Sequence, residues 1–374
     1  MTENKENNSL KKRIIIKLGT STLTDGTPFL SQSRMIDLVR QMSKLKELGA
    51  DILLVSSGAI ESGREVLNFP HLPKDIPAKQ MLAAVGQPRL MDVWGKLFGI
   101  FGLGVAQILL TRDDLRSRSR YLNARNTIQS LLAQGVIPVI NENDTVATEE
   151  IRVGDNDNLS ALIANLLDAD LLILLTDQDG LFNADPRKES NASLVNLVDT
   201  PEIAVELWAA AGGSGKLGRG GMFTKLQSAD LARRSGTEVV IARGDDPDII
   251  LRIAEGQALG TRFTATTSAI ESRKRYILAG DAAGVIELDS GALEALRNGS
   301  SLLPAGLKSV AGEFVRGETI GISDLDGHEI GRGLVSYNSS DCLKLVGKHS
   351  WEIPEILGYY FGDEIMHRNN LVLF

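Results

Sequence analysis

Two lysines stand beside glycine-rich segments, where backbone N–H groups are free to bind an anion. Lys17 ends the first apolar run of the chain and leads into Gly19-Thr20-Ser21. Lys225 follows the glycine-rich segment 212–221 and lies at the start of a predicted helix. An ammonium group in such a place favours phosphate binding. Each lysine is therefore a candidate phosphate ligand. A solvated lysine before an ordinary turn, or one after a flexible surface loop, stays open as the alternative.

The glycine-rich segment fits neither of two common nucleotide-binding motifs. Residues 213–218 have the G-x-G-x-x-G spacing, but a predicted helix at 201–211 precedes them where that motif needs a strand. Residues 215–217 resemble the end of a P-loop, yet Leu217 stands where a P-loop has Ser or Thr to hold magnesium. We expect a mobile loop that delivers Lys225 to an anion.

A run of four polar residues, Asp155 to Asn158, directly precedes an apolar helix predicted at 159–167. One Asn or Asp is enough to cap a helix, which explains Asn158 but not the three residues before it. Two carboxylates and two amides can hold a substrate ammonium, orient a lysine or help to place a metal. The run therefore favours a functional role.

The elements that must position these residues follow from hydrophobic periodicity. From Met35 to Leu48 apolar residues repeat with a helical period, and Gly49 is placed to end that helix. Short runs of successive apolar residues are typical of strands buried on both faces, and they lie at 13–16, 51–55, 136–140, 171–175 and 238–241. This alternation predicts an α/β fold with a mainly parallel sheet between layers of helices.

Each predicted strand leads directly into small or polar residues. The five segments are 17–21, 56–59, 141–144, 176–180 and 243–246. Because the carboxyl ends of parallel strands share one edge of a sheet, we expect a single polar cleft there. Its amides, hydroxyls, N–H groups and carboxylates suit a zwitterionic small molecule beside a polyphosphate.

The C-terminal part of the chain has a different pattern. From about Arg275 short alternating segments at 284–288, 318–322 and 331–336 predict a small β-rich domain with one helix at 291–297. The predicted organisation is a first domain at 1–265, a linker rich in Thr and Ser at 266–274, and a second domain at 275–374.

Composition excludes several classes of protein. The chain has 374 residues and a net charge of -8, which argues against nucleic-acid binding through bulk charge. Its single cysteine, Cys342, excludes a disulfide framework and any multi-cysteine metal site. We find no signal-peptide core near the N-terminus and no apolar stretch of the roughly 20 residues that a membrane span needs, so we expect a cytoplasmic protein.

Taken together, these segments resemble the amino acid kinase family in order and spacing over nearly the whole chain. The matching segments are 16–21, 56–60, 79–87, 121–125, 139–144, 153–162, 175–177, 184–187 and 220–225. The resemblance implies a three-layer αβα sandwich with an open, mainly parallel sheet. The tail, with Gly299 to Pro304 and Gly306, resembles a PUA domain, a small β-rich module.

The resemblance also implies an activity. The expected reaction is ATP-dependent phosphorylation of the γ-carboxylate of L-glutamate to L-glutamyl 5-phosphate, the first step of proline biosynthesis, with feedback inhibition by proline. The expected cofactors are ATP and Mg²⁺, with Mg²⁺ carried mainly by ATP and no metal ligand assigned to the protein. A homo-oligomer, either a dimer or a tetramer, and functional coupling to glutamyl phosphate reductase are implied as well.

Residue roles come from the same resemblance. Lys17 and Lys225 would flank the transferred phosphoryl group, and Asp157 would orient them. Glutamate would be held by Ser57, Gly58, Ala59, Asp144 and Asn156. The nucleotide would meet Lys17, Gly19, Thr20, Thr176, Asp177, Arg219, Gly220, Gly221, Met222, Phe223, Thr224 and Lys225. Arg219 replaces the small hydroxyl residue expected before Gly220, which leaves its contact with nucleotide open.

Two alternatives are kept. Within the family, the acceptor could be aspartate, acetylglutamate, carbamate or UMP. Outside it, the PUA domain could make this an RNA-binding protein. Residues 275–374 contain eight Lys and Arg against 14 Asp and Glu, and RNA binding normally requires neutralised phosphates, so the charge disfavours the second alternative.

Overall fold

The structure is a computed structural model, and it describes residues 12–73, 75–147, 156–212, 221–268, 271, 277–278 and 281–374. Its contacts divide the chain into two compact units, one formed by residues 1–113 and 125–269 and the other by residues 114–124 and 270–374. The break at 269–270 lies inside the predicted linker, part of which is outside the described residues. The sequence did not predict that residues 114–124 group with the second unit, and the domain bounds stay a prediction.

The first unit is built on an eight-stranded sheet in the order β3-β4-β2-β1-β5-β7-β8-β6. Its strands are β1 Arg13–Leu18, β2 Asp51–Ser56, β3 Val105–Leu110, β4 Ile137–Glu142, β5 Leu171–Thr176, β6 Leu197–Val198, β7 Glu238–Arg243 and β8 Thr261–Phe263. All neighbours are parallel except β7 and β8. The five strands predicted from apolar runs are all present, whereas β3, β6 and β8 were not predicted.

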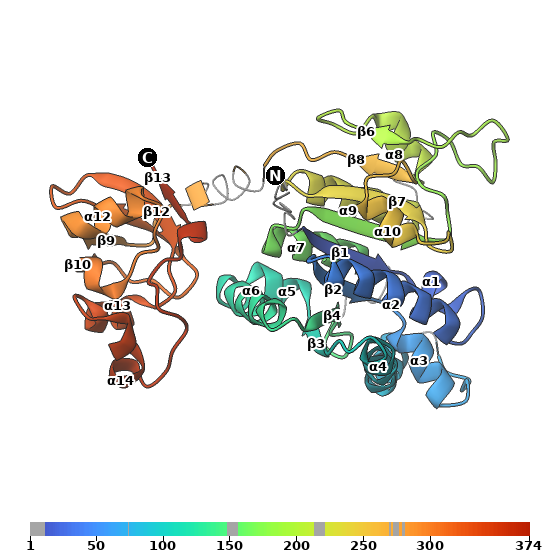
Figure 1. The fold of residues 1–374 in the computed structure, drawn as a ribbon, viewed down its shortest axis with the longest axis horizontal. Helices are drawn as coiled ribbons and strands as arrows, with labels where there is room; N and C mark the ends of the chain where they lie inside the picture. Colours follow the sequence, from blue (N-terminus) through green and yellow to red (C-terminus); the bar gives the residue numbers. More distant parts are fainter. Residues whose placement is uncertain are drawn as a thin grey trace, which may run out of the picture. The chain divides into compact units, whose positions relative to one another are not determined.

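Helices cover both faces of this sheet (Figure 1). The helices between residues 12 and 254 are α1 Thr20–Thr24, α2 Gln32–Glu47, α3 Ala59–Val66, α4 Ile76–Gly99, α5 Arg112–Arg116, α6 Arg118–Ala133, α7 Asn156–Leu167, α8 Val205–Ala210, α9 Met222–Arg233 and α10 Ile249–Ala254. The expected three-layer αβα arrangement with a mainly parallel sheet is confirmed.

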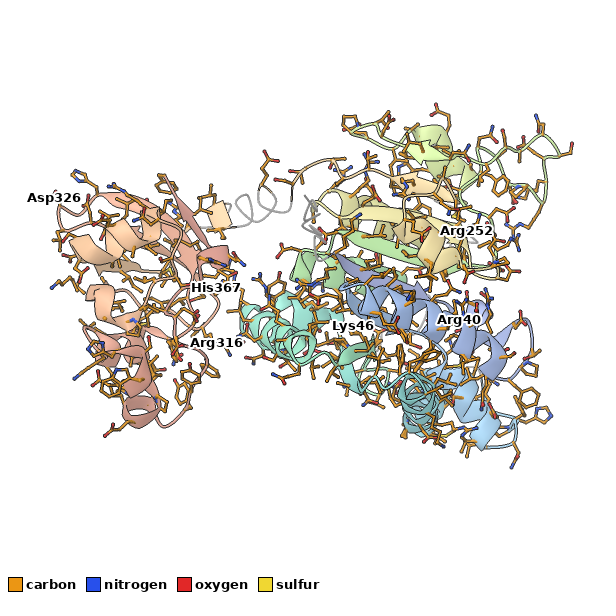
Figure 2. The ribbon with its side chains drawn as sticks, in the orientation of Figure 1. Arg40, Lys46, Arg252, Arg316, Asp326 and His367 are labelled. Carbon is orange, nitrogen blue, oxygen red and sulfur yellow. The ribbon has the colours of Figure 1, made fainter. Side chains whose placement is uncertain are left out.

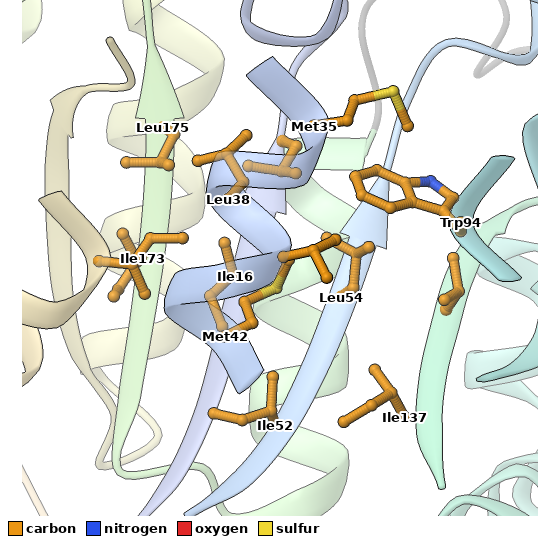
Figure 3. Close-up of a cluster of buried hydrophobic side chains, with 14 of the residues drawn as sticks. Ile16, Met35, Leu38, Met42, Ile52, Leu54, Trp94, Ile137, Ile173 and Leu175 are labelled. Atoms are coloured by element: carbon orange, nitrogen blue, oxygen red, sulfur yellow. The ribbon is translucent and has the colours of Figure 1, made fainter. Parts of the chain in front are cut away.

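One face of the sheet packs against α2, α4 and α10, and the other against α7 and α9. Figure 3 shows Met35, Leu38 and Met42 of α2 lying over the strands. The charged residues of α2, such as Arg40 and Lys46, come from its other positions (Figure 2). Amphipathic periodicity thus anchors α2, and the strand ends beside it are fixed by the buried core.

The α3 and α4 helices approach each other unusually closely because both contact points are glycines. A Cβ atom at Gly86 would lie 1.8 Å from the Ala59 carbonyl oxygen, and one at Gly63 would lie 2.0 Å from that of Leu82. No side chain fits at either point. This contact fixes the start of α3, which follows β2 directly.

The second unit contains a five-stranded sheet in the order β10-β9-β11-β12-β13. Its elements are β9 Val285–Leu288, α12 Ser290–Arg297, β10 Leu307–Ala311, β11 Thr319–Ser323, β12 Glu329–Leu334, α13 Ser339–Leu345, α14 Ile353–Leu357 and β13 Leu371–Leu373. Cys342 is buried in its core, where burial raises the pKa of the thiol to about 12. The predicted β-rich character of the tail is confirmed.

One buried arginine links the two separate segments of the second unit. Arg316 is hydrogen-bonded to Asn123 and lies 3.8 Å from the ring centre of Phe361, so it joins the segment 114–124 to the rest of the second unit. Arg316 is labelled in Figure 2.

Within the described part of the chain, no helix has the length and apolar character needed to cross a membrane.

Candidate active site

The carboxyl ends of the central strands lie along one edge of the sheet. Strand register places Leu18 beside Ser56, and Thr176 beside Arg243. A cavity of about 320 Å³ opens at this edge. Its lining residues are Lys17, Gly19, Thr20, Ser21, Ser57, Gly58, Ala59, Ile60, Glu61, Asn141, Glu142, Asp144, Asn156, Asp157, Gly221, Thr224 and Lys225.

Three charged residues from three different elements meet in this cavity. Lys17 Nζ, on β1, lies 2.6 Å from Asp157 Oδ1, and Lys225 Nζ, on α9, lies 3.2 Å from Asp157 Oδ2. Asp157 itself lies in the first turn of α7. All three residues are buried, with exposed fractions of 5%, 8% and 2% for Lys17, Lys225 and Asp157. Thr224 Oγ1 also donates a 2.8 Å hydrogen bond to Asp157 Oδ2.

The electrostatics of this group leave an excess of positive charge. Burial lowers the pKa of Lys17, and neighbouring Lys225 lowers it further, while Asp157 acts in the opposite direction. Burial alone would raise the pKa of Asp157, but the two lysines and the Thr224 hydroxyl reverse this and lower it. The group sets two lysines against a single carboxylate in a largely desolvated place. That arrangement suits a bound anion.

Polar groups without a cationic charge also line the cavity. Asn156 Nδ2 donates to Ser57 Oγ and to Asn141 Oδ1, each at 3.0 Å. Asp144 lies nearby, and burial together with the Glu61 carboxylate raises its pKa to about 6. An ionised Asp144 beside neutral amides and hydroxyls can bind a small molecule that carries both an ammonium group and carboxylates.

The predicted substrate residues Ser57, Gly58, Ala59, Asp144 and Asn156 all line this one cavity. Gly58 has a φ of 101°, a left-handed conformation that favours glycine, and it precedes α3. α7 begins at Asn156, three residues earlier than predicted. Asn158 therefore lies inside the first turn of the helix, and the prediction that it caps α7 is wrong.

The predicted nucleotide residues are spread over this cavity and two flanking ones. Lys17, Gly19, Thr20, Gly221, Thr224 and Lys225 line the central cavity. Thr176 and Asp177 line a second cavity of about 180 Å³, together with Arg243. Gly221 and Met222 line a third of about 520 Å³, beside Asp185 and Arg187.

The remaining nucleotide predictions lie elsewhere. Phe223 packs edge-on against Trp208, with 5.7 Å between ring centres, and does not line any of these three cavities. Arg219 and Gly220 lie outside the described residues, as do Asp155 and most of the segment 212–221.

Two residues that the structure places here had no individual role in the sequence prediction. Asn141 was predicted to lie at the cleft only as part of the polar segment 141–144, and Glu61 was not singled out. Asn141 could have been singled out, because it is the first polar residue after the apolar run at 136–140. Glu61 carries no such local signal.

The donor set of the cavity fits a metal carried by a nucleotide better than a metal held by the protein. Its best-placed carboxylate, Asp157, is engaged by two lysines, which would repel a cation. Among the described residues, one carboxylate and imidazole group has metal-ligand spacing, formed by Asp324, Asp326 and His328 in the second unit. Asp326 is labelled in Figure 2. Asp324 Oδ1 accepts the backbone N–H groups of the other two, so the turn itself accounts for this group.

Comparison with known proteins gives a consistent result over both units. The sequence model of the amino acid kinase family matches residues 12–243, and that of the PUA domain matches residues 284–357. A glutamate 5-kinase of Deinococcus radiodurans is 51% identical over 96% of this chain and 99% of its own length. One of Shewanella amazonensis is 52% identical over 97% of this chain and 96% of its own length. One of Vibrio campbellii is 51% identical over 100% of this chain and 99% of its own length.

Among solved structures, UMP kinase from Bacillus anthracis superposes with a TM-score of 0.46 at 16% identity. The superposition covers 68% of this chain and 97% of that chain.

Proposed function

The chain is a kinase that belongs to the amino acid kinase family, and we propose that it transfers the γ-phosphoryl group of ATP to the γ-carboxylate of L-glutamate, giving L-glutamyl 5-phosphate. The observation that carries this proposal is the pair of lysines held on one carboxylate. Lys17 and Lys225 come from opposite ends of the first unit's sequence and meet at Asp157. A site of this charge fits the terminal phosphate of a nucleoside triphosphate.

Phosphoryl transfer between two anionic groups requires that the reacting atoms are aligned and that their negative charge is shielded. A carboxylate oxygen of the acceptor attacks the γ-phosphorus in line, and the bond to the β,γ-bridging oxygen breaks. The acceptor is already an anion, so no proton has to be removed and no general base is needed. Lys17 and Lys225 would shield the equatorial phosphoryl oxygens, and Asp157 would hold both ammonium groups in position. Mg²⁺ bound to the phosphates would supply further charge neutralisation.

The same cavity offers a place for the acceptor. Ser57, Asn156 and Asp144 line the cavity, with Gly58 and Ala59 at the start of α3. Ionised Asp144 would bind the amino group, and the hydroxyl and backbone N–H groups would bind carboxylate oxygens. The nucleotide would extend from the lysines toward the flanking cavities at Thr176 and Met222.

The proposed product sets the place of the enzyme in metabolism. An acyl phosphate hydrolyses readily, so it suits a reductase that acts next, and this step would begin proline biosynthesis. Inhibition by proline at the acceptor side, assembly into a homo-oligomer and coupling to glutamyl phosphate reductase are part of the same proposal. An assay at a glutamate concentration below KM, with and without millimolar proline, tests the first of these, because saturating glutamate would displace a competitor from the acceptor side.

The central experiment is ATP-dependent hydroxamate formation from glutamate by the wild type and by Lys17→Ala and Lys225→Ala. Each substitution removes a cation that faces the transferred group, so we expect kcat to fall roughly 10²–10³-fold with a smaller change in KM for glutamate. Lys96→Ala is the matched control, because Lys96 is exposed on α4 and its ion pair among the described residues is with Asp92. Its kcat should equal that of the wild type.

Two outcomes of this experiment would contradict the proposed function. Wild-type turnover with aspartate, acetylglutamate, carbamate or UMP but not with glutamate would assign the chain to another acceptor within its family. Full activity of both lysine variants would remove the basis of the proposed mechanism.

A further inference from the structure

A chain of four side-chain amides runs from the edge of the sheet to the central cavity. Gln87, on α4, donates to Gln107 Oε1 of β3 at 3.2 Å, and its own Oε1 accepts a 2.8 Å hydrogen bond from Asn141 Nδ2. Asn141 Oδ1 accepts in turn from Asn156 Nδ2 at 3.0 Å. Gln87 does not line the cavity, yet it is hydrogen-bonded to the amide directly behind it.

The direction of this chain is fixed by two backbone groups. The Glu142 N–H, which can only donate, contacts Asn141 Oδ1 at 2.9 Å. The Ser56 carbonyl, which can only accept, contacts Asn156 Nδ2 at 3.4 Å. An amide presents an acceptor at one end and a donor at the other, so each asparagine has one orientation that satisfies its neighbours.

With this direction of hydrogen bonding, one acceptor atom at the cavity end of the chain of amides has no donor. Asn156 Nδ2 is shared among Ser57, Asn141 and the Ser56 carbonyl, whereas Asn156 Oδ1 has no hydrogen-bond partner among the described residues, although it is buried. A buried carbonyl oxygen without a donor is costly. Asn156 lines the cavity, so a ligand that brings a donor can supply the missing hydrogen bond.

We propose that Gln87 is a positioning residue for the acceptor substrate. It holds Asn141, and Asn141 holds Asn156 with its carbonyl oxygen available to the amino group of an amino acid. This inference rests on the proposed function and adds a specificity to it: the site prefers an acid that carries an amino group over the same acid without one.

The energetic argument depends on burial. Gln87 is 9% exposed and Asn141 is 2% exposed, so water does not replace a lost partner freely. Without an acceptor at position 87, Asn141 Nδ2 is left unpaired, and rotation of Asn141 relieves this at the expense of its bond to Asn156. Buried polar networks respond as a unit in this way. Loss of the acceptor at position 87 should therefore weaken substrate binding without changing the contacts of Lys17 and Lys225.

The test compares Gln87→Met with Gln87→Glu in steady-state kinetics on the full-length protein. Met keeps the volume and removes the acceptor, while Glu presents an acceptor oxygen to Asn141 whether or not it is ionised. We expect Gln87→Met to raise KM for glutamate roughly 10-fold, with kcat and KM for ATP changed less than about 2-fold. Gln87→Glu should stay within about 3-fold of the wild type.

A second substrate reports the amino-group preference directly. Glutarate is glutamate without its amino group, so Gln87→Met should lower kcat/KM for glutamate and leave that for glutarate unchanged. Gln41→Met is the matched control, because Gln41 is a buried, hydrogen-bonded glutamine of α2 outside the cavity. It should lower stability without changing KM.

The inference is overturned if Gln87→Met leaves KM for glutamate unchanged, or if it lowers kcat/KM for glutarate as much as kcat/KM for glutamate. It is also overturned if Gln87→Glu raises KM for glutamate as much as Gln87→Met does. Should Gln87→Met fail to fold, Gln87→Leu, which also lacks an acceptor at this buried position, replaces it in the comparison with Gln87→Glu. A several-fold rise in KM for Leu alone supports the inference, and equal behaviour of both variants overturns it. Loss of wild-type activity with glutamate would refute the proposed function instead, so the two failures are distinguishable.

Discussion

Asp157 is the one carboxylate between two buried ammonium groups, and its removal should be costly for folding. Asp157→Asn leaves Lys17 and Lys225 buried without a counter-charge, and breaking a buried ion pair in this way costs about 3–5 kcal/mol of unfolding free energy. Urea unfolding followed by circular dichroism measures this loss. Adding Lys17→Met to Asp157→Asn should recover part of it, since one uncompensated charge disappears. An equal loss in both backgrounds would show that the charges are not coupled.

Asp144 gives the site a pH dependence near neutrality. Its pKa is raised to about 6, and substrate ammonium would bind the ionised form, so kcat/KM for glutamate should rise between pH 5 and pH 7 with a midpoint near 6. Asp144→Asn should abolish this midpoint and lower kcat/KM at pH 7.5. Glu61→Gln should move the midpoint to lower pH, because the Glu61 charge contributes to the raised pKa. An unmoved midpoint in both variants would assign it to another group.

The same shift affects stability with a definite sign. The folded state binds the Asp144 proton more tightly than the unfolded state, whose pKa is near the ordinary value of 3.8, so stability falls as pH rises from about 4 through 6. Asp144→Asn should therefore be more stable than the wild type at pH 8, by on the order of 1 kcal/mol. The two proteins should unfold alike near pH 4, which thermal scans at both pH values can check.

At the level of elements, the glycine contact between α3 and α4 positions the acceptor side of the site. Gly86→Ala would force a Cβ within 1.8 Å of the Ala59 carbonyl oxygen. We therefore expect the free energy of unfolding to fall by about 1–3 kcal/mol and KM for glutamate to rise. Gly95→Ala lies on the same helix, where a Cβ would make an ordinary 3.7 Å contact. The free energy of unfolding of that control variant should rise by about 0.5–1 kcal/mol, because alanine favours the helix over glycine. Equal behaviour of the two variants would contradict the packing argument.

At the level of the whole molecule, the acidic C-terminal segment 275–374 argues against an RNA-binding role. We expect the full-length protein to bind single-stranded RNA no more tightly than about 10 μM at physiological salt, as measured by gel shift. The eight basic residues in 275–374 are outnumbered by 14 acidic ones. Tight binding that weakens steeply with salt would restore the RNA-binding alternative.

The sequence predicted the five central strands because each is a run of apolar residues buried on both faces. It missed β3 at the sheet edge, where only Leu110 is fully buried and the apolar signal is weaker. It also missed β6 and β8, which have two and three residues and are too short for a periodic signal. Nothing local in residues 114–124 indicated that Arg316, almost 200 positions later, would contact them.

By itself the sequence determined where polar residues follow buried strands, since hydrophobic periodicity and turn chemistry are local properties. Only the tertiary structure decided which of those residues meet. That Lys17 and Lys225 share Asp157, and that Gln87 holds Asn141 from a neighbouring helix, depends on contacts between positions far apart in the chain. The direction of a buried amide is set by the backbone groups around it, and these are brought together only when the sheet and its helices have packed.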